Sequence, residues 1–129
     1  MPRVFFRDRM RKEVQNWLDQ AADDFDGAEF NFGGKKYYIA AFFCQQAVEK
    51  ALKALLIEKT ARFPKVHDLM KLARLVEAPR DIVTRCSRIN PAYIASRYPD
   101  IPKRYSKEDC EKLLADSKVV LNWIKERLA

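Results

Sequence analysis

The sequence has few of the residues that build several common kinds of site. Only three glycines occur among 129 residues, which argues against a glycine-rich phosphate loop and against a β-rich fold with many tight turns. No run of about 18 uncharged apolar residues occurs, so no segment is predicted to span a membrane. The basic N-terminus lacks the apolar stretch of a secretory signal. We therefore expect a cytoplasmic protein with one globular domain over residues 1–129.

Cysteine and histidine are also scarce. The three cysteines, Cys44, Cys86 and Cys110, are far apart and match no zinc-binding spacing. Each falls on an apolar helical stripe, so they are predicted to be buried free thiols, with no metal site and no cofactor. The single histidine, His67, lies in the segment TARFPKVHDLM, residues 60–70.

Positive charge is present in excess and is unevenly spread. The formal net charge is +7, and residues 59–107 carry twelve lysines and arginines against four acidic residues. The segments on either side are nearly balanced. Such asymmetry favours an anionic partner, a nucleotide or a nucleic acid. Many basic proteins bind nothing acidic, so charge alone leaves the question open.

Apolar residues recur at alternating spacings of four and three, which is the pattern of one helix face. The first such stripe predicts a helix of about 20 residues, ended by Gly33-Gly34, since glycine tolerates the left-handed conformation found there. Its members are Val14, Leu18, Ala21, Phe25, Ala28 and Phe32. The second predicted helix, about residues 35–60, is apolar around most of its circumference, as in a helix central to a bundle or buried in a dimer. Glu49 and Lys53 stand on its narrow polar strip in the favourable i, i+4 order.

Prolines divide the rest of the chain. Pro64 is predicted to stop or interrupt the second helix. A short helix is predicted from about His67 to Glu77, and Pro79 suits the first position of a fourth helix. Residues 90–105 contain three prolines and are predicted to be largely non-helical. Ser106 suits the N-cap of a last helix. The predicted fold class is all-α, an up-and-down four-helix bundle with one additional short helix.

Three segments together resemble the HEPN domain family (higher eukaryotes and prokaryotes nucleotide-binding). They are AFFCQQAVEKALKALL at 41–56, VHDLMKL at 66–72 and YIASRYPD at 93–100. They occur in the family's order, between helices that carry Trp17 and Trp123. The resemblance covers nearly the whole chain. It implies an up-and-down helical bundle, often dimeric, that is frequently encoded beside a minimal nucleotidyltransferase as a toxin–antitoxin-like pair.

Several branches of the family are metal-independent endoribonucleases, and their motif is an arginine followed four to six residues later by a histidine. Arg62 and His67 fit this spacing. A histidine can transfer protons at neutral pH, and an arginine can hold phosphate oxygens. The chain departs from the motif because Phe63 replaces the usual polar residue and Pro64 lies between the pair. The alternative for His67 is a structural role at a helix start, bonded to backbone groups and Asp68.

A second group of residues could contact a nucleotide or RNA. An arginine can clamp a phosphate while a tyrosine stacks on a base. The candidates are Lys65, Tyr93, Arg97, Tyr98, Lys103 and Arg104. The alternative is that the tyrosines pack a proline-rich loop onto the bundle and Arg97 pairs with an acid such as Asp100.

Three functions are compatible with these features of the sequence. The favoured one is a nucleotide- or RNA-binding module that acts with a nucleotidyltransferase partner, without catalysis of its own. The second is a ribonuclease toxin that uses His67 and Arg62 at a dimer cleft. The third is a non-catalytic dimerisation scaffold. A homodimer is expected, because one short bundle would not cover the apolar circumference of the second helix.

Overall fold

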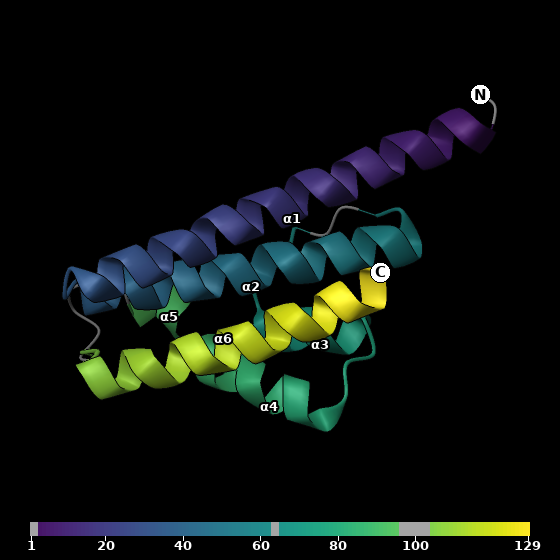
Figure 1. Cartoon of the computed structure of the whole chain (residues 1–129). Coiled ribbons are helices and arrows are strands. Elements are labelled where there is room, and N and C mark those ends of the chain that lie inside the picture. The colour runs from purple at the N-terminus through teal and green to yellow at the C-terminus, as the bar shows by residue number, and fades with distance from the viewer. Residues whose placement is uncertain (1–2, 63–64, 96–103) are drawn as a thin grey trace.

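All regular secondary structure in the described part of the chain is α-helical. The structure, a computed structural model, describes residues 3–62, 65–95 and 104–129, with side chains for Arg9 and from Arg11 onward within those ranges. The helices are α1 (Arg3–Gly33), α2 (Tyr37–Thr60), α3 (Leu69–Leu75), α4 (Arg80–Ile89), α5 (Ala92–Ala95) and α6 (Lys107–Leu128). In Figure 1, α1 and α4 run opposite to α2 and α6. The predicted up-and-down bundle with an additional short helix is confirmed.

Helix α2 is the central element. It packs against α1, α3, α4, α5 and α6 of the same chain. Its apolar residues from Cys44 to Ile57 are buried, whereas Phe42 and Phe43 are partly buried and Tyr38 is 54% exposed. Packing within one chain thus covers the apolar residues of α2 from Cys44 onward, and the partly exposed aromatic residues lie near the start of the helix. The homodimer stays a prediction.

The connection between α1 and α2 differs in detail from the prediction. Helix α1 does end at Gly33, but no described glycine has a positive φ, and the left-handed residue is Lys35 with φ 63°. The backbone N–H groups of Gly34 and Lys36 donate to the carbonyls of Phe30 and Asn31. These bonds satisfy free carbonyls at the end of α1 and close the turn.

The later helix starts follow their capping residues. Ser106 caps α6 and forms a capping box with Asp109, as predicted. Pro79 was predicted to be the first residue of α4 and is instead its N-cap, so the helix begins one residue later, at Arg80. The single-turn helix α5 lies in the segment 90–105 that was predicted to be largely non-helical. Pro91 directly precedes it, and a proline is compatible with a first helical turn because its missing N–H is not needed there.

The cysteines are buried free thiols, as predicted. Burial raises the pKa of Cys44 and Cys86 to about 12 and that of Cys110 to about 11, because the apolar interior disfavours the thiolate. Cys110 also donates a hydrogen bond from Sγ to the Tyr37 carbonyl at 3.0 Å. Each thiol belongs to the core and is protonated at neutral pH.

Candidate functional site

The candidate site is built around the corner between α2 and α3. Helix α2 ends with Ala61 in the left-handed conformation. On the far side of the corner, Asp68 is the N-cap of α3, and its side chain accepts from the N–H groups of Met70 and Lys71. These hydrogen bonds fix the backbone at the start of α3, directly after His67.

Asn90, at the end of α4, ties this corner to the bundle. Its Oδ1 accepts from the Leu69 N–H at 2.9 Å, and its Nδ2 donates to Asp68 Oδ1 at 3.2 Å. One side-chain amide thus satisfies a backbone donor at the start of α3 and holds the capping carboxylate. The chain directly after His67 is therefore held by contacts to both α3 and α4.

The His67 ring bonds to a buried carboxylate of α2. Nδ1 lies 3.0 Å from Glu49 Oε2, and the Glu49 side chain is only 6% exposed whereas that of His67 is 53% exposed. Tyr93, from α5, stacks on the ring with centroids 5.0 Å apart and an interplanar angle of 11°. The imidazole is thus held at its inner nitrogen and on one face, with about half of its surface open to solvent.

Glu49 is the centre of a buried polar network on α2. Its Oε2 accepts from Lys53 Nζ at 2.8 Å, which confirms the predicted i, i+4 pair. Its Oε1 accepts from Gln45 Nε2 at 3.0 Å, and Gln46 Nε2 donates to Gln45 Oε1 at 2.6 Å. Because a buried carboxylate needs partners for its lone pairs, this arrangement explains why polar residues occupy the core-facing helix at spacings of four.

The network favours one tautomer of the His67 ring. An acceptor at Nδ1 favours a proton on that nitrogen, so in the neutral ring Nε2 carries the free lone pair. A carboxylate orients the histidine of hydrolase triads in the same way: it accepts from one ring nitrogen, and the other nitrogen transfers the proton. The sequence reasoning missed the contact with Glu49 and expected bonds from His67 to backbone groups and Asp68. The signal that could have revealed it is the set Gln45, Glu49 and Lys53 on one face of an apolar helix.

The structure does not join the predicted catalytic pair within one chain. Arg62 is exposed, and its backbone N–H donates to Thr60 Oγ1 at 3.2 Å. Among the described residues no hydrogen bond or ion pair links Arg62 to His67. A catalytic role for both would thus need a further element, such as a second copy of the chain.

Three of the six predicted ligand-binding residues lie in the described part of the chain. Tyr93 contacts His67, and Lys65 is exposed two positions before it. Arg104 is exposed just before α6. Arg97, Tyr98 and Lys103 lie outside the described residues. The structure therefore brings together one aromatic pair with a neighbouring lysine from the predicted set.

Part of the positive charge is used inside the fold, which the sequence reasoning missed. Asp116 of α6 is 5% exposed and accepts from Arg85 Nη1 at 3.0 Å and from Arg88 Nε at 2.8 Å. The hydrogen bond to Asp116 raises the pKa of Arg88 above its ordinary value. These two arginines join α4 to α6, so they contribute less to a free basic surface than the count of charges indicates.

Two features are absent from the described residues. No group of three or more histidine, cysteine or acidic side chains among them could hold a metal ion. Within the same part of the chain, no helix combines the length and the apolarity needed to cross a bilayer.

Comparisons with known proteins agree with this architecture. The sequence model of the HEPN domain matches residues 14–128. The crystal structure of TT1696 from Thermus thermophilus has a TM-score of 0.82 and 27% identity, covering 88% of this chain and 97% of that one. ST0689, an archaeal HEPN homologue, has a TM-score of 0.79 and 29% identity, covering 91% and 98%.

A HEPN domain protein from Thermotoga maritima has a TM-score of 0.72 at 22% identity, covering 88% of this chain and 97% of that one. At that identity the likeness concerns the fold alone. The comparison with curated proteins gave no match.

Proposed function

The chain belongs to the HEPN domain family, and from this premise we propose that it is a nucleotide- or RNA-binding module whose ligand lies against the stacked rings of His67 and Tyr93. Membership in the family supports a nucleotide- or RNA-related role. The observation that carries the proposal is the half-exposed His67 ring, which a buried carboxylate holds at Nδ1 and Tyr93 covers on one face.

This arrangement suits a nucleotide for three physical reasons. An exposed aromatic ring offers a face or edge to a base, and a ring that is already held loses little conformational entropy on binding. The outer nitrogen, Nε2, carries a lone pair in the neutral ring and can accept from a ribose hydroxyl. Lys65 stands two positions away in a segment with strong positive excess, and such charge attracts phosphates.

The proposal includes a protein partner. HEPN proteins that resemble this chain are frequently encoded beside a minimal nucleotidyltransferase, and we propose that the module acts with such a partner in a toxin–antitoxin-like system. The support for this part is the family resemblance alone. The third function, a non-catalytic dimerisation scaffold, becomes one outcome of the test below.

One observation favours the second candidate, a metal-independent ribonuclease. The contact between Glu49 and His67 leaves Nε2 as a base that could take the proton of a ribose 2′-hydroxyl, and the same nitrogen could later protonate the leaving oxygen. Arg62 would then stabilise the charge on phosphorus. Because Arg62 and His67 are not joined within one chain, this candidate requires a homodimer whose cleft combines the residues of two copies.

The first experiment separates these functions with one set of purified proteins. Mixed-sequence single-stranded RNA is incubated with the wild type in EDTA, and binding is measured by fluorescence anisotropy at several salt concentrations. His67→Ala and Tyr93→Leu test the site. Lys112→Ala is the matched control, because Lys112 is an exposed lysine of α6 outside the site.

Binding without cleavage would support the favoured function if it falls steeply with salt and weakens about tenfold in both site variants, as expected for the loss of one stacking contact. Cleavage in EDTA that disappears in His67→Ala would establish the ribonuclease instead. If the wild type neither cleaves nor binds RNA or nucleotides, the module is a scaffold and the proposal is wrong.

A further inference from the structure

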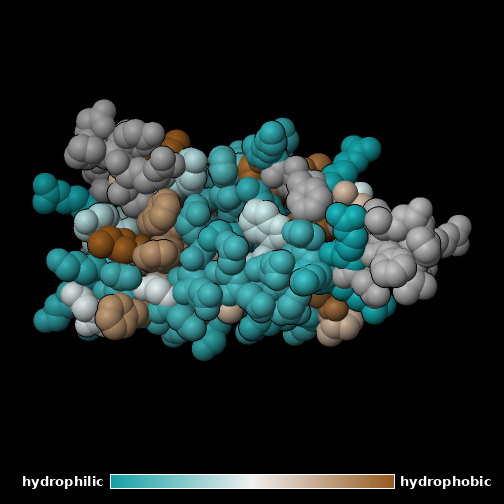
Figure 2. Space-filling model, turned by 90° about the horizontal axis from the view of Figure 1, so that it is seen from above, coloured by the Kyte–Doolittle hydropathy of each residue, from teal (hydrophilic) through white to brown (hydrophobic). Residues whose placement is uncertain are grey.

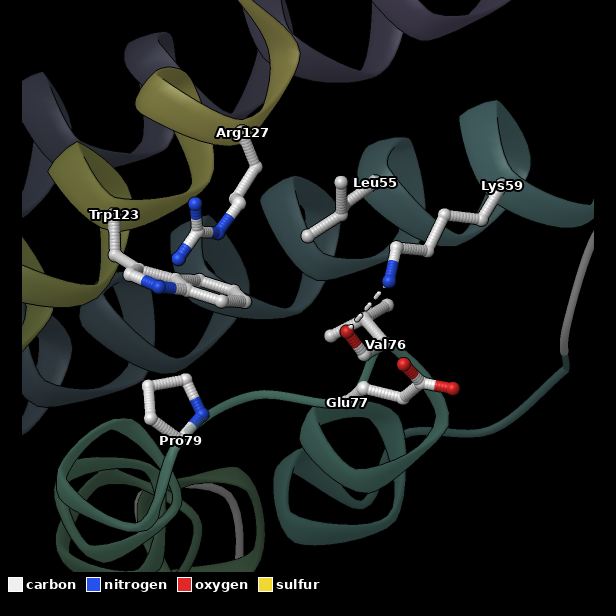
Figure 3. A pocket seen from close by; sticks show the side chains of 7 residues that line it. All are labelled: Leu55, Lys59, Val76, Glu77, Pro79, Trp123 and Arg127. Atoms are coloured by element: carbon white, nitrogen blue, oxygen red, sulfur yellow. Dashed lines mark hydrogen bonds between the residues drawn. The ribbon is translucent and has the colours of Figure 1, made fainter.

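A hollow lies between the C-terminal parts of α2 and α6 and the turn that joins α3 to α4, away from the His67 corner (Figure 3). Its volume is about 240 Å³. Helix α2 contributes Leu55 and Lys59 to it. Leu55 is six positions after Glu49, which places the two side chains roughly a third of a turn apart around the helix. The hollow and the His67 site are therefore on different faces of α2.

The inner walls of this hollow are apolar. Leu55 and Val76 are 2% and 1% exposed and belong to the core. Trp123 of α6 and Pro79, the N-cap of α4, also line it and lie next to each other in Figure 3. A tryptophan and a proline together present flat surfaces, which pack well against a planar ring.

Two cations stand at the rim. Lys59 Nζ donates to the Val76 carbonyl at 3.0 Å, which holds the ammonium at the end of α3 and leaves two of its three N–H donors. The Arg127 guanidinium lies over the Trp123 ring, with Cζ 5.2 Å from the ring centroid (Figure 3). Stacking on an aromatic ring holds the planar donor fork of an arginine in one orientation. The two cations thus have donors available for an anion.

Glu77 adds one acidic group to the same rim. Its backbone is left-handed, with φ 58°, and its N–H donates to the Arg74 carbonyl at 3.0 Å. With two cations and one carboxylate, the formal charge of the rim is positive by one. Such a rim prefers a ligand with one acidic group, and the carboxylate can accept from a donor on the same ligand.

We propose that this hollow, the Trp123 pocket, binds a small molecule in which a flat ring carries one acidic group. The ring packs against Trp123 and Pro79, and the acidic group contacts Lys59 and Arg127. The volume is below the range of about 300–1,000 Å³ that is usual for drug-sized ligands, so the occupant is small or only partly enclosed. A nucleoside monophosphate and an aromatic carboxylate share this chemistry. The inference does not depend on the proposed function, because the pocket uses none of its residues.

The test follows the indole N–H signals of the two tryptophans by NMR during titration. The probes are adenosine 5′-monophosphate and benzoate, each paired with its neutral counterpart, adenosine and benzamide. Trp17→Phe assigns the signals. Arg127→Ala and Lys59→Ala remove the cations one at a time, and Arg127 is exposed, so its variant is expected to fold. Lys118→Ala is the matched control, an exposed α6 lysine that does not line the pocket.

The expected result is a shift of the Trp123 signal by at least one anionic probe, with binding about tenfold tighter than that of its neutral counterpart. Each cation variant should lose about tenfold, as is typical of a charge-assisted hydrogen bond, and Lys118→Ala should lose nothing. Which probe binds more tightly identifies the source of the ligand. Equal binding of neutral and anionic probes, no binding at millimolar concentration, or unchanged binding in Arg127→Ala would overturn the proposal. Binding that His67→Ala abolishes would assign the probe to the other site and would also overturn it.

Discussion

At the scale of single residues, Glu49 organises the candidate site. It is a buried carboxylate that contacts Lys53, Gln45 and His67 at once. A buried charge is tolerated in a core only when it is paired and hydrogen-bonded. Glu49 therefore joins the stability of the core to the geometry of the candidate site, because the contacts that neutralise it also orient the histidine.

The variant Glu49→Gln is expected to lower the free energy of unfolding by about 2–4 kcal/mol, because it leaves the buried Lys53 ammonium without its counter-charge. Urea denaturation measures this directly. The matched control is Glu58→Gln, an exposed glutamate of the same helix, for which a change within about 0.5 kcal/mol is expected. Equal losses in the two variants would contradict the structural role of Glu49.

The same variant reports on the histidine. His67 is the only histidine in the chain, so its ring nitrogens give unambiguous ¹⁵N signals. The wild type should show the proton on Nδ1 in the neutral ring, and Glu49→Gln should shift the tautomer ratio toward Nε2, since an amide can donate to Nδ1. An unchanged ratio would mean that Glu49 does not orient the ring.

At the scale of elements, the spacing of apolar residues predicted α1 and α2, although α1 spans 31 residues and not about 20, and Pro79 and Ser106 predicted the starts of α4 and α6. Burial of one helix face imposes that spacing directly. The single-turn helix α5 could not be found in this way, because four residues do not complete a repeat. The contact of His67 with Glu49, 18 positions earlier in the chain, depends on how the corner docks against α2, and local pattern does not encode that.

Capping residues carry more local information than periodicity does, and Ser106 is the clearest case. Its hydroxyl accepts from the Asp109 N–H at 3.0 Å, and the Asp109 carboxylate accepts from the Ser106 N–H at 3.0 Å. Ser106→Ala should therefore lower the free energy of unfolding by about 1 kcal/mol, the usual value of an N-cap. Urea denaturation is again the measurement. Ser87→Ala, within α4, is the control and should change little, since its hydroxyl donates to the Thr84 carbonyl of the same helix and caps no helix start. A larger effect there than at Ser106 would contradict the capping argument.

At the scale of the whole molecule, one core supports two separate surfaces. The core residues come from every described helix, and α2 passes through their middle. Seen from the side of α1, the surface is mainly hydrophilic, with hydrophobic residues gathered toward the end where α1 meets α2 (Figure 2). Phe30 is 81% exposed in that region. The His67 corner and the Trp123 pocket lie on different faces of α2, so a ligand at one leaves the other accessible.

Burial of the three thiols makes the free energy of unfolding depend on pH, and the direction of that dependence follows from their raised pKa values. Burial raises their pKa from the ordinary value of 9.0 to about 12 for Cys44 and Cys86 and about 11 for Cys110. Above pH 9 the unfolded chain loses these protons while the folded chain keeps them. The unfolded state then binds fewer protons, so stability is fully present below pH 9 and falls as pH rises toward the folded pKa values.

The measurement compares the wild type with the triple variant Cys44→Ala, Cys86→Ala, Cys110→Ala by urea denaturation from pH 7 to 11. Lysines and tyrosines titrate in both proteins, so only the difference between them isolates the thiols. The variant should be less stable near neutrality, because it loses buried volume, and its disadvantage should shrink above pH 9 by up to about 1.4 kcal/mol per thiol and pH unit. Should the triple variant fail to fold, Cys110→Ala alone should show about one third of that slope between pH 9 and 11. A difference in stability that stays constant with pH would contradict this prediction. It would show that the thiols titrate alike in the folded and unfolded chains and are therefore not buried in the apolar core between α2, α4 and α6.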